Sequence, residues 1–194
     1  GADDNASGVA AVLTVGSKFT EIDQHKNIVL AFWSGEELGL LGSTAFVHEP
    51  PFPLEALSAY INFDMVGRMR SNNLILQAVG TSPIWPRLIE QVNVPIGFNI
   101  RIHYDPYLPT DVSSLNQAEI PSLNFFTGSH EDYHRPTDVA SAINYPDLDR
   151  IVNFGALLTK RLSDLDKAPP FTKVERVTQA GPGRDSVRAY TGTI

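Results

Sequence analysis

The sequence contains no cysteine among its 194 residues. Disulfide bridges and thiolate metal sites are therefore excluded, and any metal ion must be held by His, Asp or Glu side chains. Basic residues are also few, because 15 Lys and Arg stand against 22 Asp and Glu, for a formal charge of −7. An acidic protein repels a phosphate backbone, so no nucleic acid partner is expected. No apolar run approaches the roughly 18 residues of a membrane span, so no membrane-spanning helix is expected.

The remaining composition is that of an ordinary folded domain. Hydrophobic residues make up 42% and charged residues 19% of the chain, which is far from the signature of disorder. Residues 1–4 do not resemble a signal peptide. They are interpreted as the interior of a longer protein.

Short apolar runs alternate with segments of helical periodicity along the chain. Strands are predicted at residues 28–33, 59–63, 74–79, 98–103 and 122–126, and helices at 6–22, 36–47, 83–92, 112–118 and 145–162. This alternation predicts an α/β, three-layer domain with a mainly parallel or mixed central sheet flanked by helices. The ligand site of such a domain lies at the carboxyl ends of the strands.

A change of composition predicts the end of this domain near residue 168. Ala168-Pro169-Pro170 has the character of a linker, and the residues after it are more polar. Residues 1–168 are therefore predicted to form the core, and residues 169–194 a linker and tail.

Candidate metal ligands fall where the predicted strands end. Asp4 lies at a helix start, Glu36 and Glu37 follow the first strand, Asp64 follows the second, and His134 follows the last. Carboxylates and imidazoles are ligands that Zn²⁺ accepts. A metal hydrolase also needs a carboxylate that takes a proton from water, and two adjacent glutamates can divide these tasks.

Each residue also has a purely structural interpretation. Asp3, Asp4, Asn5 and Ser7 could cap a helix, and Ser34 with Glu37 matches the S-x-x-E capping box. Asp64 alone could form a turn, and His134 alone could be a solvent-facing histidine. The combination of all these residues favours the metal site.

The segments around these residues resemble the M28 family of di-zinc peptidases over about residues 1–165. The motifs are GADDNASG from Gly1, SGEELGLLGS from Ser34, NFDM from Asn62 and HEDYHRPTD from His130. The resemblance implies a zinc-exopeptidase fold in which Asp4 bridges two zinc ions, Glu37 and His134 complete one site, and Asp64 binds the other ion. It further implies that Glu36 is the general base and that Tyr107 steadies the oxyanion, although Tyr107 could equally be a loop aromatic packed on the surface.

The chain departs from the family pattern in two places. Val112 follows Asp111, where many members have a histidine. The family also carries a His-x-Asp motif upstream of the segment matching Gly1, and its histidine binds the same zinc as Asp64. The domain is therefore expected to be incomplete at its N-terminal side, with one zinc site incomplete and an open sheet edge that could self-associate. Residues 188–194 resemble the first strand of a PDZ-like module.

The predicted function is zinc-dependent hydrolysis of a terminal peptide bond, with an aminopeptidase and a peptide substrate favoured. The alternatives are acyl transfer of the glutaminyl cyclase kind and a non-catalytic binding domain; the retained Glu36 argues against the latter. Arg68 and Arg70 could bind a substrate carboxylate or be solvated loop charges. The resemblance implies an extracytoplasmic location.

Overall fold

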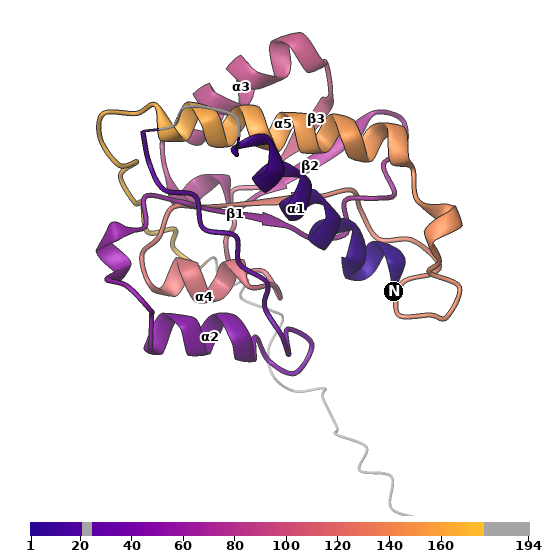
Figure 1. The fold of residues 1–194 in the computed structure, drawn as a ribbon, viewed down its shortest axis with the longest axis horizontal. Coiled ribbons are helices and arrows are strands. Elements are labelled where there is room, and N and C mark those ends of the chain that lie inside the picture. Colours follow the sequence, from indigo (N-terminus) through magenta and orange to yellow (C-terminus); the bar gives the residue numbers. More distant parts are fainter. Residues whose placement is uncertain (21–24, 177–194) are drawn as a thin grey trace, which may run out of the picture.

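The computed structural model describes residues 1–20 and 25–176, and these residues form helices around one mixed sheet (Figure 1). The sheet has the strand order β1-β4-β2-β3. β1 pairs parallel with β4, β2 pairs parallel with β3, and β2 and β4 are antiparallel. The strands are β1 (Tyr60–Phe63), β2 (Asn73–Gln77), β3 (Asn99–Ile102) and β4 (Ser122–Phe126).

Helices cover both faces of this sheet, which confirms the predicted three-layer α/β architecture. α1 (Gly8–Lys18), α3 (Trp85–Ile96) and α5 (Tyr145–Ser163) lie on one side, and α2 (Leu41–His48) and α4 (Val112–Gln117) on the other (Figure 1).

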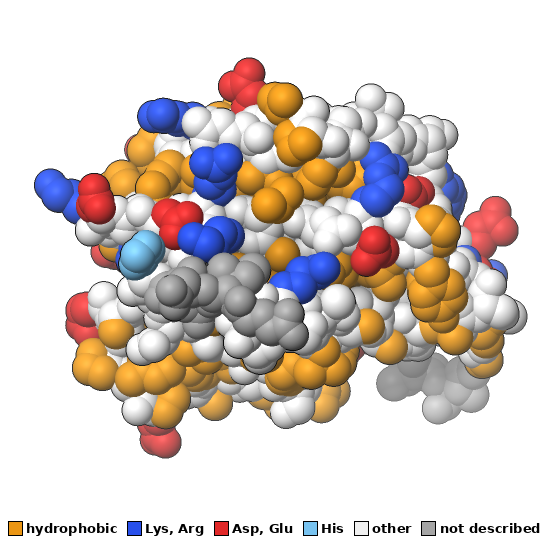
Figure 2. Space-filling view, turned by 45° about the horizontal axis from the view of Figure 1, so that its top comes forward, with side chains coloured by type: hydrophobic (Ala, Val, Ile, Leu, Met, Phe, Trp, Pro, Cys, Tyr) orange, Lys and Arg blue, Asp and Glu red, His pale blue; other side chains and the backbone are white. Residues whose placement is uncertain are grey.

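The face of the molecule in Figure 2 carries Lys and Arg side chains next to Asp and Glu side chains, without a large patch of one charge.

The main core lies between the sheet and the layer of α1, α3 and α5. Phe125 of β4 contacts Phe63 of β1 and Phe154 of α5, with ring centroids 4.7 Å and 5.7 Å apart. Phe125, Phe154 and Trp85 are among the largest fully buried side chains. Burial of large aromatic side chains is a main source of folding free energy. The strands whose ends carry the candidate ligands are therefore packed against a well-filled core.

The predicted strand at residues 28–33 does not join the sheet. The segment is assigned no strand, and Val29 and Phe32 are 53% and 49% exposed. A cavity of about 1140 Å³ is lined by this segment on one side and by β1 and α1 on the other. The prediction was wrong because an apolar run gives only a propensity. A strand also needs a partner for its backbone groups, and none of the described residues pairs with it.

The helix predicted at residues 36–47 begins later, at Leu41. Gly35 and Gly39 have φ angles of 69° and 102°, and Leu40 has a φ of 59°. These left-handed residues are incompatible with a continuous right-handed helix. Residues 36–39 form a turn instead, so the predicted helix start at Glu36 was wrong.

The other predicted elements are present with shifted ends, and β4 has the predicted bounds. After α5 the chain has no regular structure up to residue 176, but Thr172 N donates to Thr81 O at 2.8 Å. The predicted PDZ-like strand at 188–194 lies outside the described residues. None of the helices in the described ranges combines the length and apolarity required to cross a membrane.

Candidate metal centre and active site

Four segments carry the candidate ligands to one edge of the sheet. Asp4 lies in the turn Ala2–Ser7 that precedes α1, and Glu37 lies in the turn that precedes α2. Asp64 directly follows β1, where its backbone N donates to Phe125 O of β4 at 3.1 Å. His134 lies in the loop between β4 and α5. Because β1 and β4 are parallel neighbours, the residues that follow them emerge at the same edge.

Asp4, Glu37 and His134 form a compact donor group. One ligand atom from each of the three lies within 4.8 Å of the others. His134 Nε2 lies 3.0 Å from Asp4 Oδ2 and 2.5 Å from Glu37 Oε1. The His134 and Glu37 side chains are about half exposed, so an ion can reach the group from solvent. Two carboxylates and one imidazole are a suitable set for Zn²⁺ with one position left open, so these residues fit the metal that the sequence predicts.

Asp64 and Glu36 lie beside this group but outside it. Both line a cavity of about 220 Å³ together with Asp4 and Glu37. Burial, reinforced by the nearby Asp64 and Glu37 carboxylates, raises the pKa of Glu36 to about 7. Burial and the charge of Asp4 raise the pKa of Asp64 to about 6. A bound cation would offset the crowding of negative charge that contributes to both shifts.

The start of α4 adds a further carboxylate to this edge. Asp111 is 7% exposed, and burial raises its pKa. Its charge also contributes to the raised pKa values of Glu36 and Asp64. Val112, the departure from the family pattern noted in the sequence, is fully buried, and its side chain supplies no polar atom to the site.

Two residues of the site have left-handed backbone conformations. His134 has a φ of 55° and Met65, which follows Asp64, has a φ of 50°. Such a conformation costs a residue other than glycine about 1–3 kcal/mol and persists where neighbouring contacts fix it. The two ligand-bearing segments are therefore held in place by their surroundings.

The structure does not bring Tyr107 to the donor group. The Tyr107 hydroxyl donates to Val174 O at 2.7 Å, and the Arg176 guanidinium lies 4.7 Å from the centre of its ring. Tyr133, which the sequence analysis did not single out, stacks on the His134 ring with centroids 3.8 Å apart and lines the smaller cavity. Its position next to His134 in the sequence was the signal that could have identified it.

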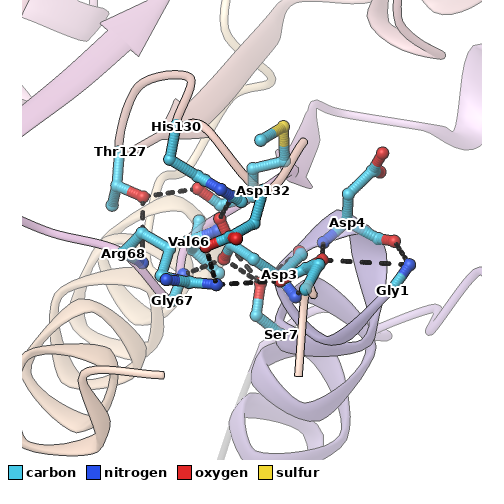
Figure 3. A network of polar contacts seen from close by, with 12 residues as sticks. Gly1, Asp3, Asp4, Ser7, Val66, Gly67, Arg68, Thr127, His130 and Asp132 are labelled. Atoms are coloured by element: carbon cyan, nitrogen blue, oxygen red, sulfur yellow. Dashed lines mark hydrogen bonds and ion pairs between the residues drawn. The ribbon is translucent and has the colours of Figure 1, made fainter. Parts of the chain in front are cut away.

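Arg68 is part of an internal ion-pair network, so its interpretation as a solvated loop charge is wrong. Its Nη2 atom lies 3.1 Å from Asp132 Oδ2 (Figure 3). The same atom lies 3.2 Å from Asp138 Oδ1. The Arg68 side chain is only 14% exposed. With both partners supplied by the chain itself, it is not a free receptor for a substrate carboxylate. Arg70 is exposed.

The capping interpretation holds for one residue of the first motif. Asn5 Oδ1 accepts a hydrogen bond from Gly8 N at the start of α1. Asp3 instead accepts from Gly67 N and from the Ser7 hydroxyl, and its second oxygen faces His130 (Figure 3). The S-x-x-E interpretation of Glu37 is wrong, because α2 does not begin at this position and the carboxylate faces His134.

Fold and donor group together define an α/β domain with carboxylate and imidazole ligands gathered at the carboxyl ends of its strands. Within that class, the chain belongs to Peptidase family M28, whose family model matches residues 1–158.

Relatives with assigned names support this membership. Leucine aminopeptidase 2 of Trichophyton rubrum is 28% identical over 173 residues, which cover 74% of this chain and 35% of that protein. Leupeptin-inactivating enzyme 1 of Streptomyces exfoliatus is 28% identical over 132 residues, covering 66% of this chain and 30% of that protein. The chain thus spans about a third of the length of these curated relatives.

Solved structures share the fold. BSAP, a zinc aminopeptidase from Bacillus subtilis, matches with a TM-score of 0.75 at 24% identity, over 89% of this chain and 45% of that one. The glutaminyl cyclase of Porphyromonas gingivalis matches with a TM-score of 0.63 at 17% identity, over 83% of this chain and 63% of that one.

Proposed function

We propose that this chain carries the catalytic core of a zinc-dependent aminopeptidase. The observation that carries the proposal is the convergence of Asp4, Glu37 and His134, whose donor atoms lie within 4.8 Å of one another beside a Glu36 that is not in the group. A metal hydrolase requires this division between ligands and a free carboxylate. The names of the relatives point to the same activity.

In this proposal Asp4, Glu37 and His134 would hold one zinc ion, and Asp4 would share a second ion with Asp64 and with a histidine from outside residues 1–194. Bound zinc supplies a Lewis acid that polarises the scissile carbonyl and makes water more acidic.

Glu36 supplies the acid–base chemistry. Its carboxylate accepts a proton from the attacking water and returns it to the nitrogen of the leaving amine as the peptide C–N bond breaks. Burial raises the pKa of Glu36 to about 7 without a metal ion, and a bound cation would lower this value, so the Glu36 carboxylate would be available as a base near neutral pH. Tyr107 stays a candidate for contact with the oxyanion only if its bond to Val174 O opens. Tyr133, which lines the cavity beside the cluster, is the better placed of the two.

The negative charge of the site supports an aminopeptidase over a carboxypeptidase. Asp4, Glu36, Glu37 and Asp64 line one cavity. Bound zinc ions would offset part of their charge, and the carboxylate oxygens left free would accept hydrogen bonds from a substrate ammonium but would not bind a carboxylate. Of the two cations that could have bound a carboxylate, Arg68 is already paired with Asp132 and Asp138, and Arg70 does not line this cavity.

Acyl transfer of the glutaminyl cyclase kind is the second candidate, because a glutaminyl cyclase shares the fold. Incubation with an N-terminal glutaminyl peptide and with a leucine amide separates the two. Loss of ammonia with ring closure supports the cyclase, and release of leucine supports the aminopeptidase. The proposal also places the protein outside the cytoplasm, which cell fractionation tests.

A further inference from the structure

Two adjacent aspartates each face a histidine, and both histidines lie in the loop between β4 and α5. Asp4 faces His134 in the proposed metal site. Asp3 faces His130, with 3.0 Å between Asp3 Oδ2 and His130 Nε2 (Figure 3). The His130 and Asp3 side chains are 2% and 0% exposed, whereas the His134 side chain is 47% exposed. The outer pair is open to an ion from solvent, and the inner pair is sealed from it.

We propose that His130 is a positioning residue for the metal site, and that its contact with Asp3 sets the placement of His134 relative to Asp4. The proposal rests on the proposed function, because it needs a metal ion at Asp4, Glu37 and His134.

The Asp3 carboxylate is suited to this task because it joins three segments. Its Oδ1 accepts from Gly67 N at 2.6 Å and from Ser7 Oγ at 3.0 Å, and its Oδ2 contacts His130. The joined segments are the turn before α1, the chain after β1 and the loop after β4. Each of them carries one of the proposed ligands: Asp4, Asp64 and His134. One buried carboxylate therefore relates three ligand-bearing segments to one another.

The loop that carries His134 is fixed at both ends. Asp138, at its far end, accepts hydrogen bonds from the backbone N of Asp3 at 2.9 Å and of Asp4 at 3.1 Å. His130 fixes the near end through Asp3. His134 lies midway between them with a φ of 55°, a conformation that persists where the surroundings determine it. The Arg68–Asp132 ion pair still holds the middle of the loop when His130 is replaced, but the link to Asp3, which lies next to the ligand Asp4, is lost. We expect the His134 imidazole then to move relative to Asp4.

The contact with Asp3 is the only side-chain hydrogen bond of His130 among the described residues, since its Nδ1 is buried without a partner there. A substitution at His130 therefore removes one defined interaction. His130→Phe keeps a ring of similar size but cannot donate. His130→Gln places an amide nitrogen near the position of Nε2 and retains the donor. His103→Phe is the matched control, because His103 is exposed and lies just after β3.

The experiment measures zinc affinity by competition with a chelator, the visible absorption of the Co²⁺-loaded chain, and the melting temperature. Loss of a residue that orients a metal ligand typically weakens metal binding by about 10–100-fold. We expect His130→Phe to show a loss of this size together with a changed Co²⁺ band shape. His130→Gln should restore most of the affinity and the parental spectrum, and His103→Phe should match the parent in all measurements.

The outcomes separate this inference from the proposed function. A parent chain that binds neither zinc nor cobalt overturns both. A parent that binds, with a folded His130→Phe variant of equal affinity and identical spectrum, overturns the inference alone. A lower melting temperature without a spectral change assigns His130 to stability and overturns it too. If His130→Phe does not fold, His130→Asn gives the same test, because its shorter amide cannot reach Asp3 Oδ2.

Discussion

Replacement of Glu36 by glutamine tests the proposed acid–base chemistry most directly. Glutamine has nearly the same size and shape but cannot accept a proton, and Glu36 lies outside the group of Asp4, Glu37 and His134. Loss of a general base costs about 10²–10⁴ in rate, equivalent to about 3–5 kcal/mol of transition-state stabilisation. We therefore expect kcat to fall by this factor while zinc content stays at the parental level.

The pH profile gives a second, independent measure. In the metal-free protein, burial and neighbouring carboxylates raise the pKa of Glu36 to about 7, and a nearby cation lowers that value. kcat/KM of the parent should therefore rise with pH through an acidic limb below neutrality, as the Glu36 carboxylate becomes available as a base. In the Glu36→Gln variant the residual activity should lack this limb.

The assay is hydrolysis of a chromogenic leucine amide, with zinc content measured on the same samples. It is run on this chain and on a longer form that contains the upstream His-x-Asp motif expected from the family resemblance. Glu90→Gln is the matched control, because Glu90 is exposed on α3. Equal activity of Glu36→Gln and parent, with zinc bound in both, would show that another group is the base. Loss of zinc in the variant would show that Glu36 is a ligand.

Four further predictions concern the metal, pH, the tail and association. In the longer form, Glu37→Ala should remove one zinc ion, Asp64→Ala the other, and Asp4→Ala both. The metal-free protein should become less stable as pH rises. Burial raises the pKa of Asp64 from 3.8 to about 6 and that of Glu36 from 4.5 to about 7. Between the unfolded and folded pKa of each group, the folded state therefore binds more protons than the unfolded state, and this stabilisation is lost as pH rises. Deleting residues 171–194 should lower the melting temperature more than deleting residues 177–194. The longer deletion also removes the hydrogen bonds that Thr172 and Val174 make with Thr81 and Tyr107, each of which contributes about 1 kcal/mol to the free energy of unfolding. The chain should self-associate through the open edge of β1 and the exposed apolar segment at 28–33, and Val29→Lys should weaken that association.

Each of these has a contradicting result. Identical zinc loss in all three ligand variants would refute the partition of ligands. A melting temperature of the metal-free protein that rises between pH 4 and pH 7, determined by calorimetry, would reverse the sign argued for Asp64 and Glu36. Equal stability of the two deletions would show that residues 171–176 contribute nothing to the core. A monomer at all concentrations in sedimentation would refute the open-edge prediction.

The sequence by itself determined most of the local elements and the chemistry of the site. The segment Ser122–Phe126 was predicted as a strand with the bounds that β4 has, because the pattern of residues in a short segment is a local property. The order of the motifs identified Asp4, Glu37 and His134, which the structure brings together. The donor types of these side chains and the lack of cysteine are also read directly from the sequence.

The tertiary structure decided everything that depends on a distant partner. The apolar run at 28–33 has the composition of a strand, but pairing requires a second segment at the right place, and the described residues do not provide one. Arg68 was interpreted as either a carboxylate-binding residue or a solvated charge. Its buried pairing was not predicted, since Asp132 and Asp138 are far away in the sequence. The buried contact between Asp3 and His130 joins residues 127 positions apart in the sequence. Side-chain chemistry and periodicity are local and can be read from the chain, whereas burial and ion pairing arise only when folding brings remote segments into contact.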